Sequence, residues 1–172
     1  MPDPVQIRLL TPLDAPAYRA LRLRGLREHP EAFTSSYEED AQQPAEAAAT
    51  RLAARSNSFW GAFAHGELVG IVGLERGRRA KERHKAVVVG MYVAPEAAGH
   101  GIGRALLDAL LAQARREGLG GLVLTVTEGN GAAQRLYEVA GFRSFGIERD
   151  AIRVAGRSHA KNHMHLDLGP SS

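Results

Sequence analysis

One stretch constrains the fold of this chain more than any other: an apolar run, a glycine-rich loop and a long amphipathic segment in direct succession. The apolar run, residues 87–93, contains Val-Val-Val-Gly-Met-Tyr-Val and is typical of a buried strand. Three glycines at alternate positions follow within residues 99–103, and an amphipathic helical pattern begins at Ile102. This order places bare backbone N–H groups and the positive end of a helix at one point. The stretch therefore predicts an anion site that suits a phosphate or a pyrophosphate.

Two common phosphate loops do not match this stretch. The nucleoside-triphosphate loop ends in Gly-Lys-Ser/Thr, which is absent here. The dinucleotide fingerprint needs the spacing Gly-x-Gly-x-x-Gly. Counted from Gly99 the third glycine would fall on Arg104, and counted from Gly101 it would fall on Leu106. What remains is Gly-x-Gly directly before a helix, which an ordinary tight turn would also explain.

Two motifs taken together resemble the GCN5-related N-acetyltransferase (GNAT) family. That family usually binds the pyrophosphate of acetyl-CoA in a loop of the form Arg/Gln-x-x-Gly-x-Gly/Ala. Residues 98–103 contain Ala-Gly-His-Gly-Ile-Gly, with Ala98 in place of the opening Arg or Gln. Residues 130–142 are similar to the family's second block, Asn-x-x-Ala-x-x-Leu-Tyr-Glu-x-x-Gly-Phe, and every signature position is filled. The motifs cover residues 87–142, and the flanks resemble the family in the order of their elements only.

The resemblance implies the acyl-CoA N-acyltransferase fold of that family, a central splayed mixed β-sheet flanked by helices. The residue patterns agree with an α/β or α+β class, because segments typical of strands alternate with amphipathic helical segments. The 172 residues are enough for one domain with a sizeable core. We expect a single acetyltransferase domain over residues 1–172, with a frayed tail at about residues 169–172.

Periodicity and turn residues predict the individual elements. Strands are expected near residues 5–10, 59–64, 67–74, 87–93, 122–127, 142–149 and 159–168. Helices are expected from a cap at Thr11 or Asp14 to about residue 29, and then over residues 45–55, 102–117 and 131–140. Residues 31–43 are expected to form a loop and a short helix. Asn130 is the predicted cap of the last helix, and Gly118 and Gly141 are the predicted helix ends.

Composition narrows the class of protein. With 44% hydrophobic and 24% charged residues the chain is ordinary for a globular protein. No apolar run reaches the roughly 20 residues that span a bilayer, and no secretory signal is visible, so neither a membrane nor export is expected. The absence of cysteine excludes disulfides and a thiol nucleophile, and it fits a cytoplasmic protein. A net charge of +3 does not demand a nucleic-acid partner, and none is expected.

A metal site is not expected either. His163 and His165 project to one face of a predicted strand, which is a common arrangement of metal ligands. Without further ligands nearby, we interpret them as ordinary strand histidines.

The resemblance implies how acetyl-CoA would bind. The N–H groups of the glycine loop would hold the pyrophosphate, and the fourth strand would pair with the pantetheine arm. A bulge at Gly90 would direct an N–H toward the thioester oxygen and stabilise the oxyanion of a tetrahedral intermediate. Arg104 would add charge or simply face solvent. The residues expected to bind the cofactor are Met91, Tyr92, Val93, Gly99, His100, Gly101, Ile102, Gly103, Arg104, Asn130 and Tyr137.

Tyr137 is the expected general acid. By resemblance it lies near the point where the thiolate of CoA departs, and a phenol can donate a proton to that sulfur. Its place on an apolar helical stripe would suit a core residue equally well. Asn130 is expected both to cap this helix and to bind a pantetheine amide, although capping alone would explain it.

No single residue stands out as the general base. Many relatives place a glutamate on the fourth strand, but residues 86–93 contain no acid. The candidates are Glu75 on the preceding strand, His84 before the fourth strand, Glu128, Glu38 and Glu39. Histidine has the intrinsic pKa best suited to this task, and a water relay to a more distant carboxylate is an equal alternative.

The acceptor side is expected between the first two strands, where similar proteins vary with their substrates. The candidates for substrate contact are Phe33, Ser35, Ser36, Tyr37 and Glu38. The two aromatic residues among them would also serve to pack the loop down. The basic connection at residues 76–85 either steers an anionic ligand or is a solvated hairpin tip.

These expectations lead to an N-acetyltransferase that moves the acetyl group of acetyl-CoA to a primary amine of a small molecule or a peptide, by direct attack. The main alternative is a CoA-binding sensor module without catalysis. A third class is a basic adaptor that binds nucleic acid through residues 76–85. Similar proteins are commonly dimers, so a homodimer is also expected.

Overall fold

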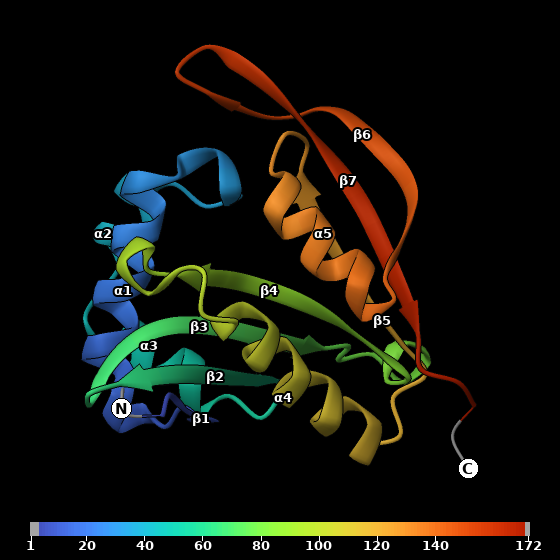
Figure 1. Ribbon diagram of the computed structural model, residues 1–172, viewed down its shortest axis with the longest axis horizontal. Coiled ribbons are helices and arrows are strands. Elements are labelled where there is room, and N and C mark those ends of the chain that lie inside the picture. The colour runs from blue at the N-terminus through green and yellow to red at the C-terminus, as the bar shows by residue number, and fades with distance from the viewer. Residues whose placement is uncertain (1–3, 171–172) are drawn as a thin grey trace.

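The computed structural model describes residues 4–170, which form a seven-stranded mixed sheet with helices on both faces (Figure 1). The strands are β1 Gln6–Leu9, β2 Asn57–Ala64, β3 Glu67–Arg76, β4 Lys85–Val93, β5 Gly121–Thr127, β6 Arg143–Val154 and β7 Arg157–Asp167. The helices are α1 Ala15–Glu28, α2 Tyr37–Ala41, α3 Glu46–Ala53, α4 Ile102–Arg116 and α5 Gly131–Ala140. Short 3-10 helices are η1 Pro12–Asp14, η2 Pro30–Ala32, η3 Ala80–Glu82 and η4 Pro95–Ala97. The expected fold class is confirmed.

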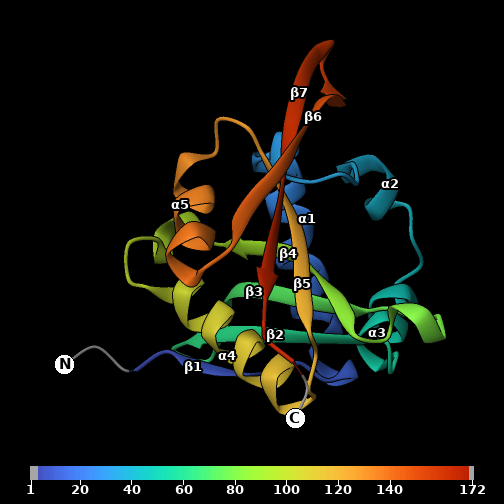
Figure 2. The same ribbon diagram turned by 90° about the vertical axis from the view of Figure 1, so that its right-hand side faces the viewer.

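The strands lie in the order β1-β2-β3-β4-β5-β7-β6, and β4–β5 is the parallel pair among antiparallel neighbours. Figure 2 shows α4 and α5 on one face of the sheet and α1 and α3 on the other. Because successive side chains of a strand point to opposite faces, neighbouring residues divide between two hydrophobic layers. Trp60 and Val72 belong to the layer that contains α4, whereas Phe59 and Ile71 belong to the layer that contains α1 and α3.

The sheet is splayed at its centre. β4 and β5 pair only over residues 85–87 of β4 and 121–123 of β5, and beyond these residues the two strands separate. The separation coincides with a bulge, because Gly90 and Met91 of β4 together oppose the single residue Val72 of β3. A bulge bends its strand and increases the local twist. Gly90 has a φ of +63°, so the predicted bulge is confirmed at the predicted glycine.

The splay corrects one expectation about β4. The apolar run was expected to be a buried strand, but Val87 is 39% exposed while Val88 is 5% exposed. Val88 points into the layer that contains α4. Val87 points to the other face, at the last β4–β5 pair before the strands separate, and it lines an open cleft.

The caps of α4 and α5 follow the sequence. Gly118, at φ +73°, ends α4, and the next amide donates a hydrogen bond of 3.1 Å to the carbonyl of Ala114. Gly141, at φ +107°, ends α5. Asn130 Oδ1 accepts a hydrogen bond of 3.3 Å from the amide of Ala133 and caps the start of α5. The predicted cap and both predicted helix ends are confirmed.

The last hairpin is longer than the sequence indicated. β6 continues past residue 149 to Val154, and the hairpin projects beyond the rest of the sheet (Figure 1). The strand continues past Asp150, which adopts a positive φ of +49° at an irregularity in the β6–β7 ladder. Of the tail expected to fray, residues 171–172 lie outside the described residues.

Replacing Gly90 with alanine should lower the free energy of unfolding by about 1–2 kcal/mol, because an L-residue in the left-handed region crowds its own carbonyl oxygen. Urea unfolding at equilibrium measures the change. Gly146→Ala is the control, since Gly146 lies on exposed β6 with nothing within 4 Å of an added Cβ. Equal stabilities for Gly90→Ala and the parent chain would contradict a bulge that depends on glycine.

Candidate active site

A cleft of about 460 Å³ opens through the gap between β4 and β5 and is lined from both faces of the sheet. Tyr137 and Asn130 line it from the side of α5, and Arg22 and Phe33 line it from the side of α1. Its volume lies within the range of small-molecule sites, about 300–1,000 Å³. The splay therefore connects a site on one face of the sheet with a site on the other.

A groove of about 630 Å³ continues from the cleft along the end of β4 toward α4. It is lined by residues 91–93 of β4, by Gly103 of α4 and by Asn130. Met91 and Ala133 line both hollows, so the groove and the cleft are continuous. This surface brings together six of the expected cofactor residues: Met91, Tyr92, Val93, Gly103, Asn130 and Tyr137.

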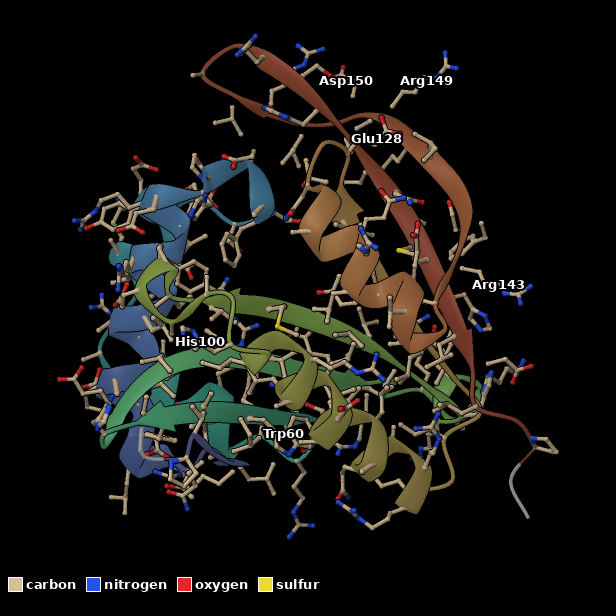
Figure 3. All side chains as sticks on the ribbon, viewed as in Figure 1. Trp60, His100, Glu128, Arg143, Arg149 and Asp150 are labelled. Carbon is tan, nitrogen blue, oxygen red and sulfur yellow. The ribbon has the colours of Figure 1, made fainter. Side chains whose placement is uncertain are left out.

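The glycine loop presents unpaired backbone N–H groups. Gly99 and Gly101 have φ values of +81° and +74°, and nothing lies within 4 Å of a Cβ added to either. Within the described chain, the N–H groups of residues 99–104 donate no hydrogen bond. His100, labelled in Figure 3 on this loop, folds back so that its Nδ1 lies 2.9 Å from the carbonyl oxygen of Ala98. The loop thus leaves its amides available to an anion at the positive end of α4.

The side chains around this loop contribute less to a candidate anion site than its backbone N–H groups do. Ile102 is 5% exposed and packs in the hydrophobic core. Arg104 Nε lies 2.8 Å from Asp108 Oδ1 on the same helix, so its charge already has a counter-ion. The candidate anion site is therefore built mainly from peptide N–H groups.

An ion pair that the sequence did not reveal holds the turn before the loop. Arg24 of α1 donates two hydrogen bonds, of 2.6 and 2.7 Å, to the carboxylate of Glu96 in η4. These bonds lower the pKa of the Glu96 carboxyl to about 2. The two residues are far apart in the sequence, so no local pattern indicated the contact. The pair connects η4 to α1 just before Ala98. Similar loops carry an Arg or Gln at the position of Ala98.

Tyr137 is both a core residue and a residue of the cleft. It is 6% exposed, and its ring packs edge to face against Phe142 with centroids 5.8 Å apart. Burial raises the pKa of its phenol, so the hydroxyl stays protonated over the neutral range. Among the described residues no group hydrogen-bonds to this hydroxyl. A place in the hydrophobic core and a place in the cleft are thus compatible for Tyr137.

Among the candidate bases, Glu75 lines the cleft, with its Oε1 3.2 Å from Arg51 Nη2. Glu128 lines the groove instead and lies on the loop that leads into α5 (Figure 3). His84 is exposed at the opposite end of β4, where its carbonyl oxygen accepts a hydrogen bond of 2.7 Å from Gly120. The structure therefore brings Glu75 and Tyr137 to one cleft and leaves His84 outside it.

The acceptor-side candidates divide between two hollows. Phe33 and Ser35 line the cleft. Tyr37 and Glu38 line a neighbouring hollow of about 430 Å³ between the start of α2 and the tip of the β6–β7 hairpin, and Phe33 and Ser35 line this hollow as well. The Tyr37 hydroxyl accepts a hydrogen bond of 2.8 Å from Arg27, so this ring packs the loop against α1.

Three cationic side chains of the cleft were not among the expected site residues: Arg22, Arg51 and Lys161. Arg22 is only 9% exposed, and Lys161 only 8%. The signal that could have found Arg22 is a charged residue on the stripe of α1 that the helical spacing marks as buried. Lys161 offers no such signal, because the strand pattern around it alternates weakly.

The sequence model described as the acetyltransferase (GNAT) family matches residues 23–142 of this chain. This chain belongs to the GNAT family. The family match includes both motifs that resembled the family, the glycine loop and the Asn-to-Phe block, so the resemblance is confirmed.

Curated relatives of this GNAT protein carry acetyltransferase names. The N-alpha-acetyltransferase RimI of Mycobacterium tuberculosis is 41% identical over 107 residues, which are 61% of this chain and 64% of that protein. The mycothiol acetyltransferase of Thermobispora bispora is 33% identical over 156 residues, which are 86% of this chain and 50% of that protein. This chain thus spans about half to two thirds of the length of these relatives.

Solved structures with similar folds cover nearly the whole chain. The Salmonella typhimurium protein yncA, solved with its cofactor acetyl-CoA, has a TM-score of 0.86 at 22% identity and covers 99% of this chain and 97% of its own. A GNAT acetyltransferase from Streptococcus pneumoniae has a TM-score of 0.84 at 24% identity and covers 96% of this chain and 100% of its own. These likenesses confirm the GNAT fold.

Two further features bear on the site. Over residues 4–170 no helix is long and apolar enough to cross a membrane. In the same range no group of three or more potential ligands could hold a metal ion. His163, one of the two histidines considered as a ligand, has its Nε2 2.8 Å from Glu148 Oε1.

The Arg24–Glu96 pair should contribute to stability in a pH-dependent way. The folded-state pKa of Glu96, about 2, lies below the ordinary 4.5, so the contribution is complete above about pH 4.5 and is lost as the pH falls toward 2. Glu96→Gln should therefore lower the urea midpoint at pH 6 and lose this effect progressively below pH 4.5. Glu67→Gln, at an exposed residue without an ion pair among the described residues, should show no such trend. A midpoint difference that is independent of pH would contradict the pair's role.

Proposed function

We propose that this GNAT protein is an acetyl-CoA-dependent N-acetyltransferase whose acceptor is a primary amine of a small molecule or a peptide. The observation that carries the proposal is the continuous path from the unpaired amides of the glycine loop, along the groove, to the cleft between β4 and β5. The names of the curated relatives, an N-alpha-acetyltransferase and a mycothiol acetyltransferase, support acetyl transfer.

The groups along this path fit acetyl-CoA. The N–H groups of residues 99–104 would bind its pyrophosphate at the positive end of α4. The edge of β4 beyond Val87 is unpaired with β5, so its backbone can bond the amides of the pantetheine arm, with Asn130 beside it. When bound, acetyl-CoA supplies the acetyl group as a thioester.

Two residues that line the cleft, Glu75 and Tyr137, would serve as the base and the acid of acyl transfer. Only a neutral amine can attack, and Glu75 would accept its proton directly or through a water molecule. A backbone N–H at the Gly90 bulge would stabilise the negative charge that develops on the carbonyl oxygen. The hydroxyl of Tyr137, protonated and without a partner in the described chain, would donate its proton to the departing sulfur. His84 has no part in this proposal, because it lies outside the cleft.

Release of free thiol from acetyl-CoA across a panel of primary amines tests the function, with isothermal titration of acetyl-CoA beside it. We expect binding of acetyl-CoA and amine-dependent release of thiol. Binding without release over the whole panel would favour the CoA-binding sensor, for which Ala98 and the lack of an acid on β4 are the supporting observations. If acetyl-CoA does not bind at all, both the enzyme and the sensor are contradicted, and the basic adaptor remains.

Tyr137→Phe should lower kcat by about 10²-fold, because the proton donor for the departing sulfur is lost. The KM for acetyl-CoA should change by less than about twofold, since the ring and its packing remain. Tyr18→Phe is the matched control. Tyr18 is also buried, its hydroxyl also lacks a partner in the described chain, and it lines a different hollow. An unchanged kcat in Tyr137→Phe would remove Tyr137 from the proposed mechanism.

The expected homodimer and the expected cytoplasmic location stay predictions. Sedimentation of the purified chain and fractionation of the source cells would test them.

A further inference from the structure

Lys161 is a buried cation that the proposed mechanism does not use. It lies on β7, opposite Thr127 of β5, and it lines the cleft while only 8% exposed. Its Nζ donates a hydrogen bond to the hydroxyl of Thr34. Among the described residues no carboxylate lies within ion-pair distance of this ammonium group. A buried ammonium group that has only a hydroxyl partner is costly unless an anion completes its surroundings.

The other cations of the cleft already have counter-ions. Arg22 Nε lies 2.6 Å from Asp40 Oδ2. Arg51 Nη2 lies 3.2 Å from Glu75 Oε1. Among the described residues Lys161 is therefore the cation of the cleft without an ion pair, since Glu148, opposite it on β6, lies beyond ion-pair distance and contacts His163 instead. Burial lowers the pKa of the Lys161 ammonium, and the more distant carboxylate of Glu148 only partly opposes that effect. The lowered pKa is the result expected for a buried ammonium group without an ion-pair partner.

The position of this charge matters for an amine acceptor. The strand order places Glu75 of β3 and Lys161 of β7 on opposite sides of the gap between β4 and β5. An acceptor with an amine alone would be repelled by Lys161 as it enters in its ammonium form. In an acceptor with a carboxylate near its amine, Lys161 would attract the carboxylate. The amine would then be directed toward Glu75 and the bulge at Gly90.

We propose that the acceptor is a primary amine that also carries a carboxylate, and that Lys161 and Thr34 bind this carboxylate. This inference rests on the proposed function. Thr34 accepts the hydrogen bond from Lys161, so its own O–H is free to donate to a carboxylate oxygen, and the residue is exposed to the solvent from which the acceptor enters. A single cation without an ion pair suits a monoanion better than a dianionic phosphate. The carboxylate belongs to a free amino acid or to an acidic residue at a peptide N-terminus, and the test separates the two.

Matched acceptors test the proposal by steady-state kinetics on the full chain. One arm compares α-amino acids with their α-carboxamides, and the other compares short amidated peptides that begin with aspartate or with asparagine. In at least one arm the acid should be preferred in kcat/KM by about 10- to 100-fold, the value of one charge-assisted hydrogen-bonded contact. Lys161→Met should remove this preference by raising the KM for the acid, with less than about twofold change for the neutral partner. Lys161→Arg should restore part of it.

Two further variants keep the result interpretable. Thr34→Val changes an exposed residue without placing a new charge, and it should weaken the preference in part. Arg149→Met is the control, because Arg149 is an exposed cation of β6 that does not line the cleft and points away from the molecule (Figure 3). Equal use of acid and neutral acceptors by the parent chain, or an equal loss for both in Lys161→Met, would overturn the inference.

A binding measurement separates this inference from the proposed function. N-acetylated amino acids and their carboxamides are titrated into the parent chain and into Lys161→Met. Binding of the acid form that depends on Lys161, without thiol release in any assay, would support the carboxylate site and contradict the enzyme. Thiol release together with equal affinity for acid and carboxamide would support the enzyme and overturn the carboxylate site.

Discussion

The parting of β4 from β5 is the constraint on which the rest of this molecule depends. A parallel ladder that continued beyond residues 85–87 of β4 would pair the strand edges and close the sheet. The bulge at Gly90 prevents this, because two residues of β4 face one residue of β3 and the strand turns away. The opening that results is lined by polar and apolar side chains from both faces of the sheet, and each hydrophobic layer remains packed on its own side.

The two ends of this opening differ in their chemistry. Near α4 the surface is mostly backbone, with glycines at positive φ and amides that have no partner in the described chain. Near α1 and β7 it contains charged side chains among apolar ones, and two of these charged residues, Arg22 and Lys161, are buried. A backbone site suits a ligand common to a whole family, since it does not depend on side-chain identity. A side-chain site suits a ligand that differs between members, because a few substitutions change its charge.

The sequence predicted the first of these ends well and the second poorly. Glycine spacing, the Asn130 cap and the Gly90 bulge are local features, and a short segment contains the information that determines them. Arg24 with Glu96, and Lys161 with Thr34, come from distant segments that only the folded sheet brings together. The same limit explains His84, which is close to β4 in sequence but at the wrong end of it. Val87 was misjudged because an apolar strand in the sequence does not show that its parallel neighbour diverges.

Helix α1 links the two ends of the opening. Arg22 lines the cleft and forms an ion pair with Asp40. Arg24, two residues further along the helix, forms an ion pair with Glu96 next to the glycine loop. A helix transmits small rotations and translations along its length as a nearly rigid rod. Displacement of α1 would therefore alter the surroundings of both ends of the opening together.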